Sequence, residues 1–395
     1  MAKIRTQVGI IGAGPAGLML AHLLHLQGIE SVVLERQTRE HVETRVRAGV
    51  LEQGTVEILC ASGVGERLKR EGLQHHGIEL RFDGKGHRID FQGLVGKSIT
   101  VYAQQEVVKD LIAARLGYNA PLFFEAEALR IEEFEAQPRI TYQQAGVNHE
   151  IACDFIAGCD GFHGISRLAV PAGQLQIHER HYPFAWLGIL ARVAPASEEL
   201  IYTYHERGFA LLSMRSPEVS RLYLQCAPDE DINNWPDERI WEELRTRMAT
   251  RDGFVLKDGP ILQKGITPMR SFVAEPMQFG KLFLLGDAAH IVPPTGAKGL
   301  NLAVADVRVL VCGLVEVYKH GKRDALQRFT ERCLRRVWKA QRFSWWMTSM
   351  LHRFPNEDSF AHNLHHAELD YVTSSRAAST ALAENYVGLP FDTNG

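Results

Sequence analysis

The chain contains 395 residues, enough for a sizeable core and for two or three domains. Its 44 lysine and arginine residues nearly balance 47 aspartate and glutamate residues, and the formal charge of -3 argues against a dedicated nucleic-acid binder. No stretch approaches the roughly 18 uncharged apolar residues of a transmembrane helix, so we expect no membrane partner. The six cysteines include no CxxC pair, which favours a reducing cytoplasm over a disulfide scaffold or a zinc site.

The first forty residues have the pattern of a strand, a turn, a helix and a second strand. Residues 7–11 are short and mostly apolar, and leucines recur at helical spacing between 18 and 26. Residues 31–34 form another apolar run that ends at Glu35. Glycines interrupt the N-terminal apolar stretch, so we do not expect a secretory signal there. We predict instead a βαβ unit.

The pattern of polar and apolar residues changes in the middle of the chain. Polar and apolar residues alternate in short segments between about 180 and 267, which indicates a half-buried antiparallel sheet. Residues 237–248 have the pattern of an amphipathic helix. The pattern of a buried strand returns at 281–287, and a helical pattern without proline or glycine covers 326–351. We therefore predict a nucleotide-binding domain that is interrupted by inserted substrate-binding segments.

The turn after the first strand reads Gly12-x-Gly14-x-x-Gly17. Gly12 permits the tight turn, Gly14 lets the backbone approach a pyrophosphate, and Gly17 lets the helix pack closely on the strand. Glu35 is placed to accept a hydrogen bond from a ribose hydroxyl. The alternative is a structural turn, but the flanking strand, helix and acid favour a dinucleotide site. The motif alone does not separate FAD from NAD.

Two later motifs favour a flavin. Gly286-Asp287 follows an apolar strand and precedes a second glycine-rich helix start at 296–301. Asp287 can hold a ribityl hydroxyl, and the helix N-terminus can stabilise negative charge on a flavin ring; the alternative for Asp287 is a helix N-cap. Cys159-Asp160-Gly161 with Arg167 is the third motif, and its alternative is a plain strand-to-turn Asp-Gly. Cys153 and Cys159 we expect to be buried packing thiols.

Taken in this order and spacing, the three motifs resemble those of the flavoprotein aromatic hydroxylases, the single-component class A monooxygenases. The resemblance covers essentially the whole chain, and five segments match the members of this family that hydroxylate 4-hydroxybenzoate. These segments are Arg45–Gly54, Ala157–Arg167, His290–Leu302, Phe343–Ser349 and Glu384–Pro390. The last two are specific to those members rather than to the broad family.

The resemblance implies an α/β fold with a Rossmann-like FAD-binding domain of the glutathione-reductase type, an inserted β-rich substrate domain and a C-terminal helical region. We expect the FAD-binding domain at 1–73, 98–180 and 268–347, the substrate domain at 74–97 and 181–267, and a helical interface region at 348–395. The implied reaction uses FAD, NADPH or NADH, and O2. A C4a-hydroperoxyflavin would hydroxylate 4-hydroxybenzoate to 3,4-dihydroxybenzoate.

Several residues of the half-buried sheet predicted between about 180 and 267 match positions that bind the substrate carboxylate in the family. Ser213, Arg215 and Tyr223 would bind it, since arginine suits a bidentate carboxylate contact and serine adds a donor. Met214 would lie between the first two in the substrate site. Taken alone, a Ser-x-Arg on a strand is usually a surface feature, and the flanking motifs are the reason to assign it here.

The substrate phenol has its own set of matching positions. Tyr202 would hydrogen-bond the phenolic oxygen, and Tyr386 would hydrogen-bond Tyr202. This chain would draw the phenol proton away and leave a more reactive phenolate. His75 matches the outer end of the relay, and the backbone carbonyl of Pro294 would lie near the phenol oxygen. A single tyrosine in a β-rich segment is more often a core residue, and with seventeen histidines a chance match of His75 is easy.

The same resemblance supplies positions for the two nucleotides. Those for FAD are Gly12, Gly14, Ala16, Gly17, Glu35, Arg45, Arg47, Ala48, Gly49, Val50, Gln104, Asp287, Leu300 and Asn301, and Lys298 would add positive potential near the flavin. Those for NAD(P)H are Arg36, Gln37, His163 and Arg270. Arg36 and Gln37 match NADPH-using relatives, but His41 replaces a tyrosine and two glutamates add repulsion, so NADPH is favoured and NADH stays possible.

The helix expected at 326–351 carries a basic stripe opposite aromatic residues. We interpret it as a solvated face with an apolar contact in a homodimer rather than as a nucleic-acid surface, because the net charge is negative. The main alternative function is a hydroxylase of a related benzoate, such as 3-hydroxybenzoate or 3,4-dihydroxybenzoate. A flavin-bound redox sensor is the alternative from another class, and it would have no need of a paired-tyrosine relay. We expect no metal.

Overall fold

The computed structural model describes residues 3–47 and 49–391. A six-stranded sheet in the order β19-β20-β13-β2-β3-β9 holds the glycine-rich turn, and all its neighbours are parallel except β19 and β20. Its strands are β2 Val8–Ile11, β3 Ser31–Leu34, β9 Leu122–Phe123, β13 Phe155–Gly158, β19 Gln278–Phe279 and β20 Leu282–Leu284. The strands predicted at 7–11, 31–34 and 281–287 are thus confirmed.

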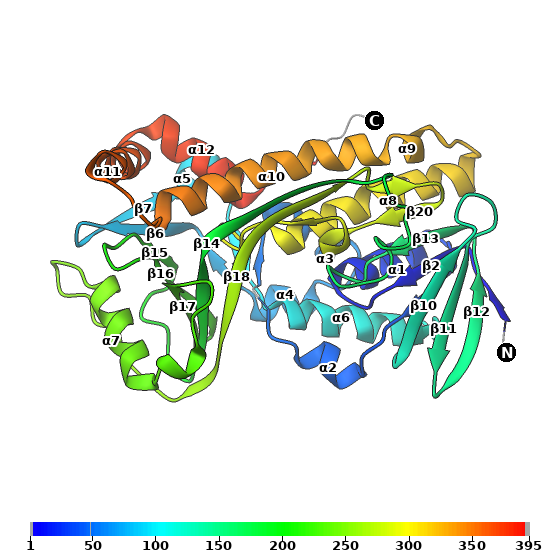
Figure 1. Cartoon of the computed structure of the whole chain (residues 1–395), viewed down its shortest axis with the longest axis horizontal. Helices are drawn as coiled ribbons and strands as arrows, with labels where there is room; N and C mark the ends of the chain where they lie inside the picture. The colour runs from blue at the N-terminus through cyan, green and yellow to red at the C-terminus, as the bar shows by residue number, and fades with distance from the viewer. Residues whose placement is uncertain (1–2, 48, 392–395) are drawn as a thin grey trace.

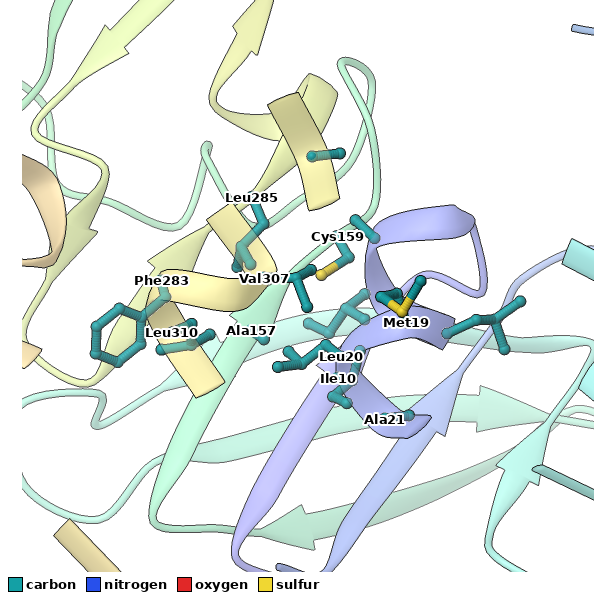
Figure 2. Packing of buried hydrophobic residues seen from close by; sticks show 14 of the residues in the cluster. Ile10, Met19, Leu20, Ala21, Ala157, Cys159, Phe283, Leu285, Val307 and Leu310 are labelled. Atoms are coloured by element: carbon teal, nitrogen blue, oxygen red, sulfur yellow. The ribbon is translucent and has the colours of Figure 1, made fainter. Parts of the chain in front are cut away.

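Helices cover this sheet because its short apolar strands must be buried on both faces. Ile10, Ala157 and Phe283 of the sheet pack with Leu20 of α1 and Val307 of α8 in one core (Figure 2). The predicted packing thiols Cys153 and Cys159 are buried in the same core. The helices of this half are α1 Pro15–Leu26, α2 Arg39–Thr44, α3 Gln53–Ala61, α4 Glu66–Glu71, α6 Gln104–Gly117 and α8 Gly299–His320.

Two smaller sheets flank the nucleotide half. One has the order β1-β12-β11-β10 and stands at the right edge of Figure 1. The other has the order β4-β8-β5 and joins the segment after Arg47 to the strand that ends in His75. Their strands are β1 Lys3–Arg5, β4 Val50–Leu51, β5 Leu73–His75, β8 Ile99–Val101, β10 Ala126–Glu132, β11 Arg139–Gln144 and β12 Val147–Ala152.

An eight-stranded sheet in the order β21-β18-β14-β17-β16-β15-β6-β7 forms the other half of the molecule. The long strands β14 and β18 run from the nucleotide half into it, as Figure 1 shows. The early hairpin β6–β7 joins its far edge through parallel pairing with β15. The strands are β6 Gly77–Phe82, β7 Lys85–Asp90, β14 Gln176–Ala191, β15 Leu200–Thr203, β16 Ala210–Ser216, β17 Val219–Cys226, β18 Ile261–Glu275 and β21 His290–Ile291.

Helices bury each face of the large sheet in a separate core. One face packs with α7 (Asp237–Met248), which confirms the amphipathic helix predicted at 237–248. The other face packs with α5 (Phe91–Val95), α10 (Phe329–Leu351), α11 (Ser359–Ser374) and α12 (Arg376–Val387). The helix predicted at 326–351 is present as α9 (Asp324–Gln327) and α10, with a break at Arg328. Among the described residues, no helix is both long and apolar enough to span a membrane.

Candidate active site

The middle of the large sheet presents a row of side chains to the core beneath α10 and α12. Tyr202 lies opposite Leu211, and Leu211 lies opposite Tyr223 on the next strand. Directly opposed residues of neighbouring strands project to the same face, so the two tyrosines flank one leucine. Alternation along β16 places Ser213 and Arg215 on that face as well. Four of the predicted substrate residues therefore share one surface.

Tyr202 meets Tyr386 across this core. Their hydroxyl groups hydrogen-bond to each other, and both side chains are almost fully buried. Burial raises the pKa of Tyr202, while the bonds from Tyr386 and from the Gly296 backbone lower it. Burial also raises the pKa of Tyr386, and the neighbouring Tyr202 raises it further. Both phenols are neutral at physiological pH, and Tyr386 would donate to Tyr202 if Tyr202 lost its proton.

The guanidinium of Arg215 forms no ion pair with a carboxylate among the described residues. Burial lowers its pKa, its Nε has no hydrogen-bond partner in the described chain, and one Nη2 donates to the backbone carbonyl of Arg47. Ser213 donates only a long bond of 3.4 Å to the carbonyl of Met214, which is buried in the same core. Arg215 is half-buried, and a guanidinium that is partly withdrawn from water without an anion is costly. A carboxylate between Ser213 and Arg215 would relieve that cost.

Arg221 is a residue of this surface that the sequence analysis missed. It lies opposite Ser213, its guanidinium stands 5.0 Å over the ring of Tyr223, and its Nε also lacks a partner in the described chain. Gly188 leaves room for it, since a Cβ there would lie 2.8 Å from the Arg221 Nη2. The sequence could have predicted this position, because Arg221 lies two residues before Tyr223 on β17 and so faces the same side of the sheet.

The loop that carries Pro294 closes the same core from the nucleotide half. Gly296 adopts a φ of 91°, and a Cβ there would lie 2.8 Å from the ring of Phe343. Thr348 of α10 donates to Thr295 at 3.0 Å, and both side chains are fully buried. Pro294 itself is exposed, and its carbonyl accepts from the N–H of Ala297 at 2.9 Å. Contacts of Thr295 and Gly296 with α10 thus fix the loop, and Pro294 is exposed on its opposite side.

His75 ends strand β5 and is almost fully buried. Neither of its ring nitrogens has a hydrogen-bond partner in the described chain. Burial lowers its pKa to about 4, against the opposing effect of Glu199. A neutral imidazole can accept and donate a proton at its two nitrogens, which suits a relay through bridging water. No direct contact joins His75 to Tyr386 among the described contacts.

The glycine-rich turn has the shape that a dinucleotide requires. A Cβ at Gly12 would lie 2.3 Å from the carbonyl of Cys159, and one at Gly17 would lie 2.0 Å from the carbonyl of Gly12. At Gly14, the N-cap of α1, nothing lies within 4 Å of that position. The protein therefore fills the space at Gly12 and Gly17 but leaves the helix N-terminus open beside Gly14, where a pyrophosphate fits. Ala16 is buried in the first turn.

Glu35 stands at the end of β3 beside this turn. Its two carboxylate oxygens accept from the N–H groups of Ala13 and Gln37, each at 2.9 Å. Each oxygen keeps a further lone pair for a ribose hydroxyl. Glu35 also lines a cavity together with Gly12, Arg36 and His163. The residues predicted for FAD and for the nicotinamide nucleotide are therefore neighbours here.

Arg270 lies away from that cavity but is linked to it by ring contacts. Its guanidinium stands 4.6 Å over the ring of Phe162, and Phe162 packs edge-to-face on His163 at 5.0 Å. Arg270 also pairs with Glu179 at 3.6 Å. Arg36 and His163 thus line one cavity, Arg270 is not among the residues that line it, and Gln37 donates its backbone N–H to Glu35 at 2.9 Å.

The segment after α2 carries the remaining predicted flavin contacts. Arg45 and Arg47 are exposed, while Ala48 lies outside the described residues. A Cβ at Gly49 would lie 2.4 Å from the carbonyl of Tyr102, so only glycine allows the segment to approach the start of α6. That helix begins at Gln104, the predicted contact. The side chain of Asp287 is exposed, and its electrostatic interactions with Arg45 and Arg47 favour the charged carboxylate.

The side chain of Asn301 forms hydrogen bonds within the protein. Its side-chain oxygen accepts from the N–H of Glu52 at 2.9 Å and from Thr55 at 2.8 Å, while its amide donates to the carbonyls of Val50 and Ala297 at 3.0 and 2.9 Å. The side chain is thus fully used inside the protein. Any contact with a flavin at Leu300 and Asn301 would come from the backbone N–H groups in the first turn of α8.

Lys298 is also buried rather than directed outward. Its ammonium group donates to Glu52 at 2.7 Å and to the backbone carbonyls of Asn385 and Tyr386. Burial lowers its pKa and Glu52 opposes that effect. Glu52 also pairs with Arg336 at 3.0 Å. Glu52 is therefore shared between two cations, and Lys298 fastens the end of α12, where Tyr386 lies, to the start of α8.

Comparison with known proteins places this geometry in a family. A model of the FAD binding domain matches residues 5–344. The p-hydroxybenzoate hydroxylase of Acinetobacter baylyi is 50% identical over 393 residues, which cover 99% of this chain and 97% of that protein. The 3-(3-hydroxy-phenyl)propionate/3-hydroxycinnamic acid hydroxylase 1 of Burkholderia vietnamiensis is 26% identical over 342 residues, which cover 82% of this chain and 52% of that protein.

Solved structures show the same fold. The p-nitrophenol 4-monooxygenase PnpA of Pseudomonas putida has a TM-score of 0.84 at 16% identity and covers 98% of both chains. The aklavinone-11 hydroxylase complex with FAD and aklavinone has a TM-score of 0.76 at 19% identity and covers 89% of this chain and 70% of that chain. The predicted α/β fold class is confirmed. The chain belongs to the FAD-binding flavoprotein monooxygenases and, within them, to the p-hydroxybenzoate hydroxylase family.

Proposed function

We propose that this protein hydroxylates 4-hydroxybenzoate at the carbon ortho to its hydroxyl group, giving 3,4-dihydroxybenzoate. One molecule each of NADPH, a proton and O2 would be consumed, and NADP+ and water would be released with the product. The observation that carries the proposal is the shared surface of Tyr202, Ser213, Arg215 and Tyr223, closed by Tyr386. Identity of 50% to a protein named p-hydroxybenzoate hydroxylase supports it.

The two ends of the substrate would be recognised by different chemistry. Arg215 and Ser213 would bind the carboxylate, and Tyr223 would add a third contact. Arg215 would exchange its bond to the Arg47 carbonyl for this stronger, charge-assisted pair. Tyr202 would face the phenolic hydroxyl, with the carbonyl of Pro294 nearby. A benzoate with its hydroxyl group opposite the carboxylate would therefore span the row of side chains.

The tyrosine pair would move a proton away from the substrate. The phenol would donate to Tyr202, Tyr202 to Tyr386, and Tyr386 through water toward His75. Because burial raises the pKa of both tyrosines, neither keeps a negative charge for long, and the charge rests on the substrate. Loss of the proton increases electron density at the ortho carbon. FAD, when bound, supplies the electron transfer and the activation of O2 that deliver an electrophilic oxygen to that carbon.

NADPH is the proposed electron donor, and NADH remains an alternative. Arg36 lies beside Glu35 in the cavity that also contains His163, and its guanidinium could pair with a 2′-phosphate. Glu40 and Glu43 of α2 follow closely, and Glu43 already pairs with Arg39 at 2.7 Å. Rates with the two nucleotides, measured side by side, decide the preference.

We also propose a homodimer in the cytoplasm, with the two halves described above acting as FAD-binding and substrate domains and 348–395 as the interface region. The support for a dimer is an apolar face on α11, where Phe360, Leu364 and Tyr371 are 71%, 57% and 57% exposed. Trp345 of α10 is 43% exposed. The described cysteines are all free thiols, which suits a reducing compartment.

Product analysis tests the function. The purified yellow protein is mixed with 4-hydroxybenzoate and NADPH in air, and the expected product is 3,4-dihydroxybenzoate. The second candidate, a hydroxylase of 3-hydroxybenzoate or 3,4-dihydroxybenzoate, is tested with the same assay on a panel of benzoates. Product rather than NADPH loss is scored, because a poor substrate can still stimulate NADPH oxidation. A flavin-dependent sensor would show no substrate-stimulated oxygen consumption.

A further inference from the structure

A buried acid–base pair lies directly behind the Gly286-Asp287 motif and has no part in the function proposed above. Asp306 is in the apolar stretch of α8, next to the core residue Val307 (Figure 2), and is only 2% exposed. Its Oδ2 accepts from the ring Nε2 of His290 at 2.6 Å and from the backbone N–H of Gly286 at 3.0 Å. A charged residue inside an apolar helix face is costly unless it is fully paired.

The carboxylate of Asp306 also acts on the titration of its partner. Burial alone would lower the pKa of His290, but Asp306 outweighs burial and raises it. The carboxylate of Asp306 also helps to raise the pKa of the buried Cys333 thiol of α10. Asp306 thus accepts hydrogen bonds from both ends of the Gly286–His290 segment.

The segment is held at its centre as well. Arg167, from the Cys159-Asp160-Gly161 motif, donates to the carbonyl of Ala288 at 3.0 Å. Gly286 has a φ of 59°, and a Cβ there would lie 3.2 Å from that of Ala303. With Gly286, Ala288 and His290 fixed, Asp287 is the residue of the segment whose side chain is exposed. The Cys159-Asp160-Gly161 motif and the Gly286-Asp287 motif are therefore in direct contact. Together they fix the direction in which the side chain of Asp287 points.

We propose that Asp306 and His290 are positioning residues for the flavin, which fix the Gly286–His290 segment so that Asp287 faces the ribityl chain. Asp306 does not touch the flavin in this arrangement and acts through the backbone and through His290. The inference rests on FAD binding, a property of the family, and not on which benzoate is hydroxylated. Failure of the proposed substrate would therefore leave it untouched.

The test measures FAD release from the full-length holoenzyme. Asp306→Asn keeps the size of the side chain but removes its charge, and His290→Gln removes the ring while the Gly286 bond stays. Released FAD is followed by its fluorescence after dilution, and the visible spectrum of the bound flavin is recorded. Each variant should release FAD about 10-fold faster or more, the scale of a lost bond to a charged group. The double variant should be little worse than Asp306→Asn alone, because the residues act as a unit.

Cys333→Ala is the matched control. It removes a contact with the same carboxylate without touching the Gly286–His290 segment, so its thermal midpoint should fall while FAD release stays within about twofold of the wild type. Should Asp306→Asn fail to accumulate as holoenzyme, His290→Gln gives the same comparison. Release rates for both positions that match those of Cys333→Ala, at a similar loss of stability, would show that the pair serves packing only and would overturn the proposal.

Discussion

The hydroxyl groups of Tyr202 and Tyr386 hydrogen-bond to each other although 184 residues separate them along the chain. Tyr202 belongs to strand β15, and Tyr386 belongs to α12, the last helix described. The contact exists only when the C-terminal helices pack on the large sheet. Lys298 secures that packing by binding the carbonyl of Tyr386 at 3.0 Å. The proposed relay therefore depends on the whole fold and not on a local motif.

Replacing Tyr386 with phenylalanine should slow hydroxylation by about 10- to 100-fold, since a positioned proton acceptor in a relay contributes on this scale. Substrate binding and substrate-stimulated flavin reduction should remain measurable. Stopped-flow spectroscopy separates these steps, and product is quantified by chromatography. Tyr204→Phe is the control, because Tyr204 follows Tyr202 closely but bonds weakly to His362 at 3.4 Å. Unchanged product formation in Tyr386→Phe would show that the relay assignment is wrong.

Replacing Arg215 with alanine should weaken 4-hydroxybenzoate binding by about 2–4 kcal/mol, as for a buried charge pair that loses one partner. Isothermal titration measures the dissociation constant directly. The exposed Arg192→Ala, at the end of the same sheet, should bind like the wild type. If the Arg215→Ala protein is folded, retains its flavin and binds 4-hydroxybenzoate as tightly as the wild type, Arg215 does not bind the substrate carboxylate.

Two glycines of the nucleotide turn should respond differently to alanine. At Gly12 the new Cβ meets the Cys159 carbonyl at 2.3 Å and the φ is 103°, so the free energy of unfolding should fall by about 1–3 kcal/mol. At Gly14 the protein offers no clash, so the apoprotein should stay within about 0.5 kcal/mol of the wild type. Gly14→Ala should instead weaken FAD binding. Equal effects of the two variants on urea unfolding and on FAD titration would contradict this division.

His75 should make stability depend on pH. Burial lowers its folded pKa to about 4 from an ordinary value of 6.5, so the unfolded chain takes up the proton first as pH falls. The free energy of unfolding should therefore drop by about 1.5 kcal/mol between about pH 6.5 and pH 5 on account of this residue. His75→Asn should lose that part of the slope in urea unfolding. The exposed neighbour His76→Asn should keep it, and identical slopes for all three proteins would refute the buried, neutral state of His75.

The apolar face of α11 should control self-association. Glutamate in place of Phe360 and Leu364 should convert the dimer to a monomer in light scattering, because two charges would be buried at the interface. Leu168→Glu is the matched control, since Leu168 is 76% exposed but lies far along the chain from α11. A dimer that survives the double substitution would place the interface elsewhere.

Much of the fold follows from patterns in the sequence. The alternation after residue 180 predicts the large sheet, and the glycine spacing predicts the turn that opens beside Gly14. Helix α7 has the predicted bounds because its apolar residues recur strictly at helical spacing. These features depend on local periodicity or on backbone sterics, which a single sequence displays.

Long-range polar contacts could not be read in the same way. Asn301 stays a predicted flavin position, but the sequence did not show that its side chain is saturated by groups near residues 50–55 and 297. The sequence also did not show that Lys298 pairs with Glu52. Which partner a buried polar group finds depends on how elements far apart in sequence dock. The one feature of the sequence that indicates a buried polar contact is a charged residue within an apolar helix, as at Asp306.

Isotope labelling tests the central claim most directly. The holoenzyme is supplied with 4-hydroxybenzoate, NADPH and ¹⁸O₂ in ordinary water, and the product is examined by mass spectrometry. We predict 3,4-dihydroxybenzoate with one ¹⁸O atom at the new hydroxyl group. Absence of this product, or a new hydroxyl group whose oxygen comes from water, would contradict the proposed monooxygenase function.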